Sequence, residues 1–461
     1  MGLSQAIQGA ALVAPEQFDR FRQHIDPVWV EEAVVATGFA SLRRRRLPAD
    51  QVVWLVVGMA LMRNESIERV ASFLNVALPA GTGPKPVAPS ALTQARQRLG
   101  DEPMEYLFNT TASHWAHRSA KAHPWRNLAV YALDGTTVRV PDSPDNWEQF
   151  GGNPGNGIRA GSAYPTVRAV ALMAARSHLI AAARFGGYAT GEVTLAAELW
   201  GQLPENSVVI IDRNFTAVRD LLEIATGAKN RHWLVRAKAH MKPLLVEKLG
   251  PNDELVELPV TRPMRASSSK PMPDTVHMRA IRYQRPGFRP GVLLTSLLDP
   301  KKYPAEEIVQ LYHERWEIEL AYDEIKTHLL DRQEAIRSRT PQRVRQEVWG
   351  ILLAYNLVRV EMERAADEVG VEPTRISFVN ALSLIRTAWL VWSTPPLAPG
   401  RIPEHLLDLR RHLGLLLLPE RRSERSYPRV VKIKMSNYDK KWVKRPRLNT
   451  TALGVCGGAS D

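Results

Sequence analysis

A run of four apolar residues, Val208 to Ile211, constrains the fold of this chain more than any other feature of the sequence. Because no polar residue interrupts it at alternate positions, the run predicts a strand buried on both faces, as in parallel sheets that carry helices on each side. A second apolar run, residues 128–133, predicts another strand, and helical patterns flank both. The chain is therefore expected to be an α/β protein.

Each of these predicted strands ends in an aspartate, Asp134 after the first and Asp212 after the second. In open α/β sheets, sites form outside the carboxyl ends of the strands, so both carboxylates are expected at one edge. Gly135 leaves room for a ligand to approach the backbone beside Asp134. Taken singly, an aspartate after a strand is more often a turn former or a helix N-cap than a functional residue.

A third acid lies in a helix predicted over residues 304–330. At about 100° per residue, four polar residues of this helix share an arc of about 60° beside an apolar stripe that can pack on the sheet. They are Tyr312, Arg315, Glu319 and Lys326. A solvated face with an Arg315–Glu319 ion pair explains only two of the four. We therefore expect the four residues to border a functional site.

Three carboxylates without a His or Cys cluster favour hard, oxygen-liganded ions, Mg²⁺ or Mn²⁺. The single cysteine, Cys456, excludes a cysteine-based zinc site and a disulfide framework. Two such ions about 3.5–4 Å apart can activate an attacking oxygen and stabilise the leaving oxygen at a phosphodiester. In this interpretation Arg315 and Lys326 contact phosphate oxygens.

The charge balance indicates a polyanionic partner, since 61 Lys and Arg oppose 48 Asp and Glu, for a net charge of +13. Two tracts concentrate this charge. Residues 43–46 are Arg43, Arg44, Arg45 and Arg46, and residues 421–447, which include Arg429 and Lys432, hold eleven Lys and Arg against two acids. Such tracts bind DNA without sequence preference. A solvated loop and a solubilising tail remain the alternatives.

The first 120 residues have helical patterns, and one short predicted helix, residues 91–99, carries side chains suited to reading DNA. These are Gln94, Arg96, Gln97 and Arg98. They can hydrogen-bond base edges or phosphates, as in the reading helix of a helix-turn-helix module. A solvated amphipathic helix explains the pattern equally well.

The apolar runs are too short for a membrane span, which needs about 18–20 residues; residues 52–62 form one of the longest. The N-terminus lacks the pattern of a signal peptide. We therefore expect a cytoplasmic, nucleoid-associated protein without a membrane or small-molecule partner.

The spacing Tyr-x2-Arg-x3-Glu-x6-Lys, at Tyr312, Arg315, Glu319 and Lys326, resembles the signature of DDE transposases of the insertion-sequence-4 (IS4) family. Residues 133–137 and 211–215 fit the strings around the first two acids of that family. Residues 43–48 and 90–100 are similar to its N-terminal domain, and the tail around Tyr427 is typical of it. The similarity covers roughly residues 20–445.

This resemblance implies a ribonuclease H-like catalytic core with a β-rich insertion between the second and third acids, and a helical N-terminal DNA-binding domain. The expected boundaries are residues 1–120 for the helical domain, 121–395 for the catalytic domain with its insertion at about 228–300, and 396–461 for the basic segment.

The resemblance also implies cut-and-paste transposition. The protein would bind the terminal inverted repeats of double-stranded DNA, cleave there and join the ends to target DNA, as a homodimer in the synaptic complex. By position, Asp134, Asp212 and Glu319 would be catalytic and bind two Mg²⁺ ions, with Mn²⁺ possible. Tyr312, Arg315 and Lys326 would hold DNA phosphates.

Relatives that form a DNA hairpin use an aromatic residue of the insertion to receive a flipped base. Trp233 is the candidate here, although residues 232–235 are equally well explained as a buried strand. Two other functions remain open: a catalytically inactive or domesticated DNA-binding descendant acting as a regulator, and a nuclease without strand transfer.

Overall fold

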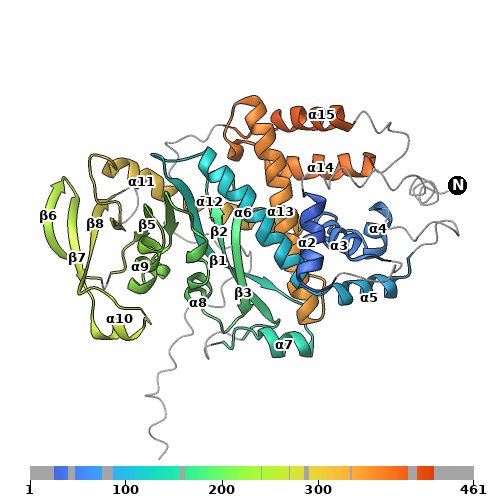
Figure 1. Cartoon of the computed structure of the whole chain (residues 1–461), viewed down its shortest axis with the longest axis horizontal. Coiled ribbons are helices and arrows are strands. Elements are labelled where there is room, and N and C mark those ends of the chain that lie inside the picture. The colour runs from blue at the N-terminus through green and yellow to red at the C-terminus, as the bar shows by residue number, and fades with distance from the viewer. Residues whose placement is uncertain are drawn as a thin grey trace, which may run out of the picture. The chain divides into compact units, whose positions relative to one another are not determined.

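The computed structural model describes residues 25–39, 47–74, 87–155, 161–239, 241–268, 270–284, 290–332, 335–392 and 402–419 (Figure 1). Apart from Gln284, all of these belong to one compact unit. The predicted DNA contacts Arg43, Arg44, Arg45, Arg46, Arg429 and Lys432 lie outside the described residues. None of the described helices is long and apolar enough to cross a membrane.

The N-terminal part is helical, as its sequence pattern predicts. Its helices are α2 (Pro27–Ala36), α3 (Ala49–Leu61), α4 (Ile67–Phe73), α5 (Pro89–Leu99) and α6 (Glu102–Ala122). Helix α5 begins with a proline at its first turn and ends at Gly100, whose φ of 71° allows the reversal that closes it. The 21-residue helix α6 has no counterpart among the predicted elements.

The central part alternates strands with short helices. Its strands are β1 (Ala129–Arg139), β2 (Thr166–Ala174), β3 (Ile180–Gly187), β4 (Ser207–Ile211), β5 (Arg231–Arg236), β6 (Leu244–Gly250), β7 (Asp253–Pro259), β8 (Thr275–Tyr283) and β9 (Gly291–Thr295). Its helices are α7 (Pro144–Phe150), α8 (Glu192–Ala197), α9 (Val218–Thr226) and α10 (Arg262–Ala266). Helices then return in α11 (Ala305–His313), α12 (Trp316–Asp323), α13 (Pro341–Val369), α14 (Phe378–Trp392) and α15 (Ile402–Gly414).

The strands form one sheet in the order β3-β2-β1-β4-β5-β9-β8-β7-β6. Strands β1, β2 and β3 are antiparallel neighbours, whereas β1, β4 and β5 pair in parallel. The half from β3 to β5 fits a ribonuclease H-like core, which confirms the mixed α/β prediction. Residues Ser207 to Ile211 are fully buried, as expected of a central parallel strand.

The inserted strands β6 to β9 extend the same sheet and do not form a separate one. Strand β5, which the sequence analysis assigned to the insertion, pairs in parallel with β4 and thus belongs to the core. The expected start of the insertion at residue 228 is therefore too early. Trp233, in β5, is only 1% exposed, and its carbonyl accepts a hydrogen bond from Thr295. The expectation that Trp233 receives a base is wrong, because a strand in mid-sheet buries this indole.

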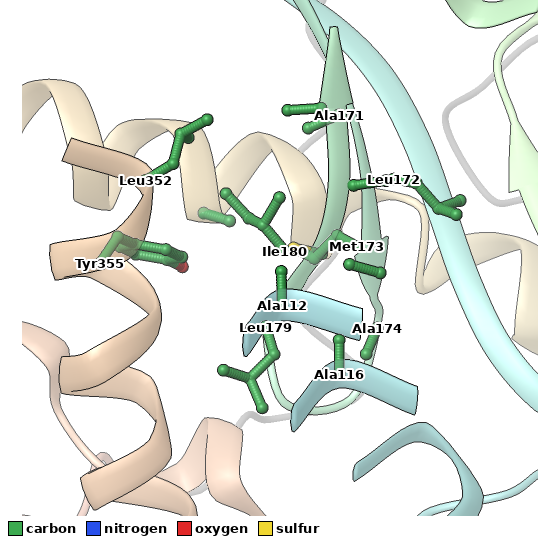
Figure 2. Packing of buried hydrophobic residues seen from close by; sticks show 14 of the residues in the cluster. Ala112, Ala116, Ala171, Leu172, Met173, Ala174, Leu179, Ile180, Leu352 and Tyr355 are labelled. Atoms are coloured by element: carbon green, nitrogen blue, oxygen red, sulfur yellow. The ribbon is translucent and has the colours of Figure 1, made fainter. Parts of the chain in front are cut away.

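Helices α6 and α13 cover the sheet near β3, where small residues allow close packing. Figure 2 shows Ala112 and Ala116 of α6 close to Met173 and Ile180 of the β2–β3 pair, with Tyr355 of α13 opposite. The edge of β3 is closed by α13, because the Asn356 amide both accepts from the Ile180 N–H and donates to the Ile180 carbonyl. Helix α13 thus fixes the core sheet.

The N-terminal helices also pack on α13. Gly350 permits this approach, since a Cβ there would lie 2.6 Å from Val56 Cγ1 and 3.2 Å from the Val56 carbonyl oxygen of α3. Arg96 of α5 is 6% exposed and donates to Gln346 of α13 at 2.9 Å. The expectation that Arg96 reads DNA is therefore wrong, because this guanidinium is used to join two helices. Gln94, Gln97 and Arg98 are exposed on the same helix.

A buried ion pair fastens the end of α3 to α13. The Arg63 guanidinium donates to Glu347 Oε1 at 2.6 Å, and both side chains are about as buried as the apolar core, at 2% and 3% exposed. Burial alone would raise the pKa of the Glu347 carboxyl, but the charges of Arg63 and Arg96 and the hydrogen bonds from the Arg337 N–H and the Ser338 hydroxyl outweigh it, so the pKa is lowered. Removing one partner leaves a charge buried without its counter-ion.

We predict that Arg63→Leu lowers the free energy of unfolding by about 3–5 kcal/mol, because Glu347 then stays buried without its main counter-ion. The control is Arg69→Leu, which breaks the exposed Arg69–Glu65 pair and should cost less than about 1 kcal/mol. Urea unfolding followed by circular dichroism measures both. Equal losses in the two variants would contradict the importance assigned to this buried pair.

Candidate active site

Asp134 and Asp212 lie side by side at the edge of the central sheet. The parallel pairing of β1 with β4 ends at Leu133 and Ile211, so each aspartate directly follows the last paired residue. Neighbouring strands are about 4.8 Å apart, which brings the two residues together. Strand β1 continues through Asp134 to Arg139, because its antiparallel pairing with β2 extends further. The expected strand end at residue 133 is therefore wrong, although the position of the acid at the edge is as expected.

Arg315 connects the first acid to the third. One guanidinium nitrogen lies 3.3 Å from Asp134 Oδ2 and the other lies 2.7 Å from Glu319 Oε1. Because the guanidinium is a rigid planar group, these two contacts hold the carboxylate oxygens within about 8 Å of each other. The side chain of Arg315 is only 12% exposed, whereas those of Asp134 and Glu319 are 21% and 38% exposed. The structure thus brings together all three acids that the sequence analysis selected.

The charges of these residues act on one another. Burial raises the pKa of the Asp134 carboxyl to about 6, and the negative charges of Asp212 and Glu319 act in the same direction. The Gly135 N–H and the Arg315 guanidinium oppose this shift. Such an arrangement, with carboxylates crowded at a partly buried edge, favours the binding of cations.

Tyr312 and Lys326 lie on either side of this group along the chain. Burial raises the pKa of the Tyr312 hydroxyl to about 12, and the negative charge of Asp212 acts in the same direction. Burial lowers the pKa of the Lys326 ammonium. The Tyr312 side chain is buried and that of Lys326 is half-buried.

The single helix expected over residues 304–330 is divided into three pieces in the structure. Helix α11 ends at His313, α12 begins at Trp316, and residues Glu324–Leu329 form a π-helical segment. At its end, the Leu330 N–H donates to the fifth preceding carbonyl, that of Ile325, at 2.9 Å. The angular positions derived at 100° per residue therefore hold only within each piece. The break places Arg315 at the start of α12, facing Asp134.

A bidentate ion pair holds the chain at the break between α11 and α12. The Arg176 guanidinium, in the turn between β2 and β3, donates to both oxygens of Glu314 at 2.8 and 3.0 Å, and also to the Pro124 carbonyl. Glu314 is the last residue before Arg315. The turn of the core sheet therefore holds the chain where the bridging arginine begins its helix.

A buried polar network lies beneath α12 and the π-helical segment. His178, whose backbone adopts the left-handed conformation with a φ of 63°, has its Nδ1 2.6 Å from a guanidinium nitrogen of Arg359. Its Nε2 lies 2.8 Å from Glu317 Oε2. Arg359 also pairs with Glu324, which accepts from Tyr355 at 2.7 Å. The network ties the helix of Glu319 to β3 and α13.

Glu324 makes this network sensitive to acid. Burial alone would raise the pKa of its carboxyl, but Arg359, His178 and Tyr355 together lower it to about 2. Because the pKa of this carboxyl is lower in the folded state than in the unfolded state, its ionisation stabilises the fold fully at pH values above the unfolded-state pKa of 4.5. This stabilisation is lost as the pH falls toward the folded-state pKa of about 2.

We predict that wild-type protein loses about 3 kcal/mol of its unfolding free energy between pH 5 and pH 2 through Glu324. Glu324→Gln should be less stable at pH 7 and should lack this part of the acid-dependent loss. Glu205→Gln, which changes an exposed carboxylate before β4, should follow the wild-type curve. Urea titrations at a series of pH values measure this difference, and identical slopes for Glu324→Gln and wild type would refute the prediction.

The three acids offer the oxygen donors that hard divalent ions prefer. Among the described residues, no three His, Cys, Asp or Glu side chains are arranged closely enough to hold an ion, and the Arg315 guanidinium lies between Asp134 and Glu319. The three carboxylates are chemically suited to bind such an ion. To coordinate an ion together, they would require the Arg315 guanidinium to turn away from at least one of them.

Two residues at this edge were not among those selected from the sequence. Trp316, 48% exposed, directly follows Arg315, whose guanidinium carbon lies 5.3 Å from the centre of the indole ring. The sequence could have indicated Trp316, because this residue directly follows the arginine of the Tyr-x2-Arg-x3-Glu-x6-Lys spacing. Glu192, the first residue of α8, contacts Gly135. No spacing rule connects Glu192 to the other acids, so only the fold reveals it.

Two family profiles match the chain. The profile described as "Insertion element 4 transposase N-terminal" matches residues 15–109, and that described as "Transposase DDE domain" matches residues 125–357. The second contains Asp134, Asp212 and Glu319, on which the geometry above depends.

Curated relatives agree with these profiles. The chain is 36% identical to "Transposase InsG for insertion sequence element IS4" of Escherichia coli K12 over 439 residues, which cover 92% of this chain and 96% of the relative. It is 34% identical over 236 residues to "Putative transposase InsZ" of the same organism, covering 51% of this chain and 77% of that one.

A solved structure of the piggyBac transposase synaptic complex with hairpin DNA matches with a TM-score of 0.40 and 10% identity, covering 85% of each chain. A similarity of that size supports no conclusion about this protein. The two profiles and the relative that matches over nearly its whole length show that the chain belongs to the IS4 family of DDE transposases. It is a metal-dependent DNA transposase of an insertion sequence.

Proposed function

We propose that this transposase binds the terminal inverted repeats of its element, cleaves the double-stranded DNA there and joins the ends to target DNA by cut-and-paste chemistry. It acts on DNA of the nucleoid as a homodimer that holds two ends in one synapse. The observation that carries this proposal is the meeting of Asp134, Asp212 and Glu319 at one edge, with Arg315 in contact with the first and third.

Asp134, Asp212 and Glu319 would hold two Mg²⁺ ions, or Mn²⁺ in their place. When bound, such ions activate the attacking oxygen and stabilise the leaving oxygen during in-line displacement. The crowding of carboxylates at a partly buried edge supports this assignment, because it leaves a surplus of negative charge there.

Arg315, Tyr312 and Lys326 would bind the phosphates next to the cleaved bond. A guanidinium has five N–H donors in a fixed fork, so Arg315 can contact a phosphate while it retains one carboxylate. Lys326 would act as a point charge, and the protonated Tyr312 hydroxyl would act as a hydrogen-bond donor. These groups orient the scissile phosphate toward the acids.

The remaining DNA contacts belong to the helical domain and the basic tracts. We assign end recognition to residues 1–120, where Gln94, Gln97 and Arg98 are exposed on α5. The arginines at 43–46 and the cations of the 396–461 segment would neutralise phosphates. The catalytic domain then spans residues 121–395, with its insertion formed by β6 to β9.

We predict that Asp134→Asn and Glu319→Gln each reduce DNA cleavage by about a thousandfold or more, because the loss of a metal-holding carboxylate removes several kcal/mol of transition-state stabilisation. Both variants should still bind DNA carrying the element's end. The control is Glu306→Gln, which changes an exposed acid in the first turn of α11 and should cleave normally.

The assay incubates end-bearing DNA with the full-length protein and Mg²⁺ and resolves nicked, hairpin and joined products on a denaturing gel. Undiminished cleavage by Asp134→Asn would overturn the assigned chemistry. Wild-type protein that binds ends without cutting them would instead identify a regulator, and cutting without joined products would identify a nuclease.

We further predict that Trp316→Ala weakens the binding of cleaved ends by about five- to a hundredfold, because an exposed indole beside the acids can stack on a DNA base. Trp316→Phe should restore most of the loss, since the stacking face is retained. Fluorescence anisotropy with a labelled, pre-cleaved duplex measures this affinity. A failure of phenylalanine to restore binding would exclude stacking as the role of this residue.

A further inference from the structure

A short strap, residues 335–340, joins the end of β1 to the start of α13. Ala335 forms a β-bridge with Arg139, the last residue of β1, and the Ile336 N–H donates to the Arg139 carbonyl at 3.2 Å. Arg139 follows Asp134 by five residues, which corresponds to a rise of about 17 Å along the strand. The strap therefore begins about half a turn of duplex DNA away from the first acid.

The strap also contacts helix α5 of the N-terminal part. The Arg96 guanidinium donates to the Ser338 hydroxyl at 3.1 Å, and the Arg96 carbonyl accepts from the Gln346 amide of α13 at 2.9 Å. The residue that follows on each segment, Gln97 on α5 and Arg339 on the strap, is exposed. The hydrogen bond between Arg96 and Ser338 thus brings an exposed amide and an exposed guanidinium to one region of the surface.

Two arginines of this region make no ion pair with any described acid. Arg339 has no side-chain partner within the described part of the chain, although its carbonyl accepts from the Ser143 hydroxyl at 2.8 Å. Arg343, in the first turn of α13, donates through Nε to the Thr340 hydroxyl at 2.9 Å, and its two terminal nitrogens have no partner among the described residues. Both guanidiniums therefore retain N–H donors for a ligand.

Positive charge exceeds negative charge beneath this surface. The buried acid Glu347 pairs with Arg63 at 2.6 Å, whereas the Arg337 guanidinium donates only to main-chain carbonyls, at 2.7 and 3.3 Å. Burial lowers the pKa of the Arg96 guanidinium; Glu347 opposes this shift, and the charges of Arg343 and Arg337 act with burial. A surplus of guanidinium groups at a surface attracts a polyanion.

Solvation alone explains a single unpaired arginine on a surface, but this region combines several features. Arg339 and Arg343 are unpaired together, they lie over buried arginines that one carboxylate does not neutralise, and they adjoin the exposed amide of Gln97. A guanidinium with unused donors suits a phosphate, which it can bind through two parallel hydrogen bonds. A glutamine on a helix suits a base edge. The combination is that expected of a surface for duplex DNA.

We infer that Arg339 and Arg343 bind backbone phosphates of the same duplex whose bases α5 contacts. This inference rests on the proposed function, which assigns end recognition to residues 1–120, and it extends that recognition into the catalytic domain. Phosphate contacts fix the position of a duplex, whereas contacts to base edges read its sequence. The strap then holds the duplex between α5, which reads the end, and β1, which carries the first acid.

The test measures the salt dependence of DNA binding by the full-length protein. Fluorescence anisotropy with a labelled duplex of the terminal inverted repeat gives the affinity, and EDTA prevents cleavage. Each phosphate contact contributes about 0.9 to the slope of log affinity against log salt concentration. Arg339→Ala and Arg343→Ala should each lower the slope by about this amount and weaken binding about three- to tenfold at about 150 mM salt. The double variant should lose both contributions.

Arg411→Ala is the matched control, because it also removes one exposed arginine. Arg411 pairs with Asp408 on α15, which lies at the other end of α13 from α5 (Figure 1), so its salt slope should equal that of wild type. Arg343→Lys should also keep the wild-type slope, because lysine retains the charge that releases counter-ions. Thermal melting verifies folding, and Arg339→Ala, which removes no side-chain hydrogen bond, decides the question if Arg343→Ala does not fold.

A folded Arg339→Ala or Arg343→Ala protein with the salt slope of wild type would overturn the inference. A weaker preference of these variants for the repeat over a scrambled duplex would also overturn it, because phosphates are the same at every sequence. Wild-type protein that binds both duplexes equally would instead refute the end recognition of the proposed function. In that case the salt slopes would still decide whether the strap binds phosphates.

Discussion

The parallel pairing of β1 with β4 is the constraint on which the active site depends. The pairing ends at Leu133 and Ile211, and the next residue on each strand is an aspartate. A shift of one residue in this register would separate the two carboxylates along the edge and turn one of them to the other face of the sheet. The buried side chains of β4 prevent such a shift, because every residue of that strand is enclosed.

The third acid is held at this edge by polar contacts and not by apolar packing alone. Arg176 fixes the residue before Arg315, and the network around His178 and Arg359 fixes the helix that follows. Hydrogen-bonded networks of this kind select one arrangement, because any displacement leaves buried polar groups without partners. The protein thus positions Glu319 through groups that lie beneath it and take no part in the proposed chemistry.

Much of the core fold was predictable from local patterns. The apolar run at 208–211 indicated a central strand, and Gly100 marked the end of α5. Helix α6 was missed, since its apolar positions are interrupted by polar ones and its stability comes from packing on β3 and α13. Trp233 and Arg96 were assigned to DNA contacts although both are buried, because side-chain type does not reveal which face of an element is covered.

The sequence by itself determined the family and the acids, because the spacing from Tyr312 to Lys326 and the strings around Asp134 and Asp212 are local patterns along the chain. Only the tertiary structure decided how Arg315 lies between two of those acids and that Glu192 packs over Gly135. The physical reason is that both depend on contacts between distant segments. Arg315 meets a strand 181 residues away, and the volume over Gly135 is filled by a helix that begins only after two further strands.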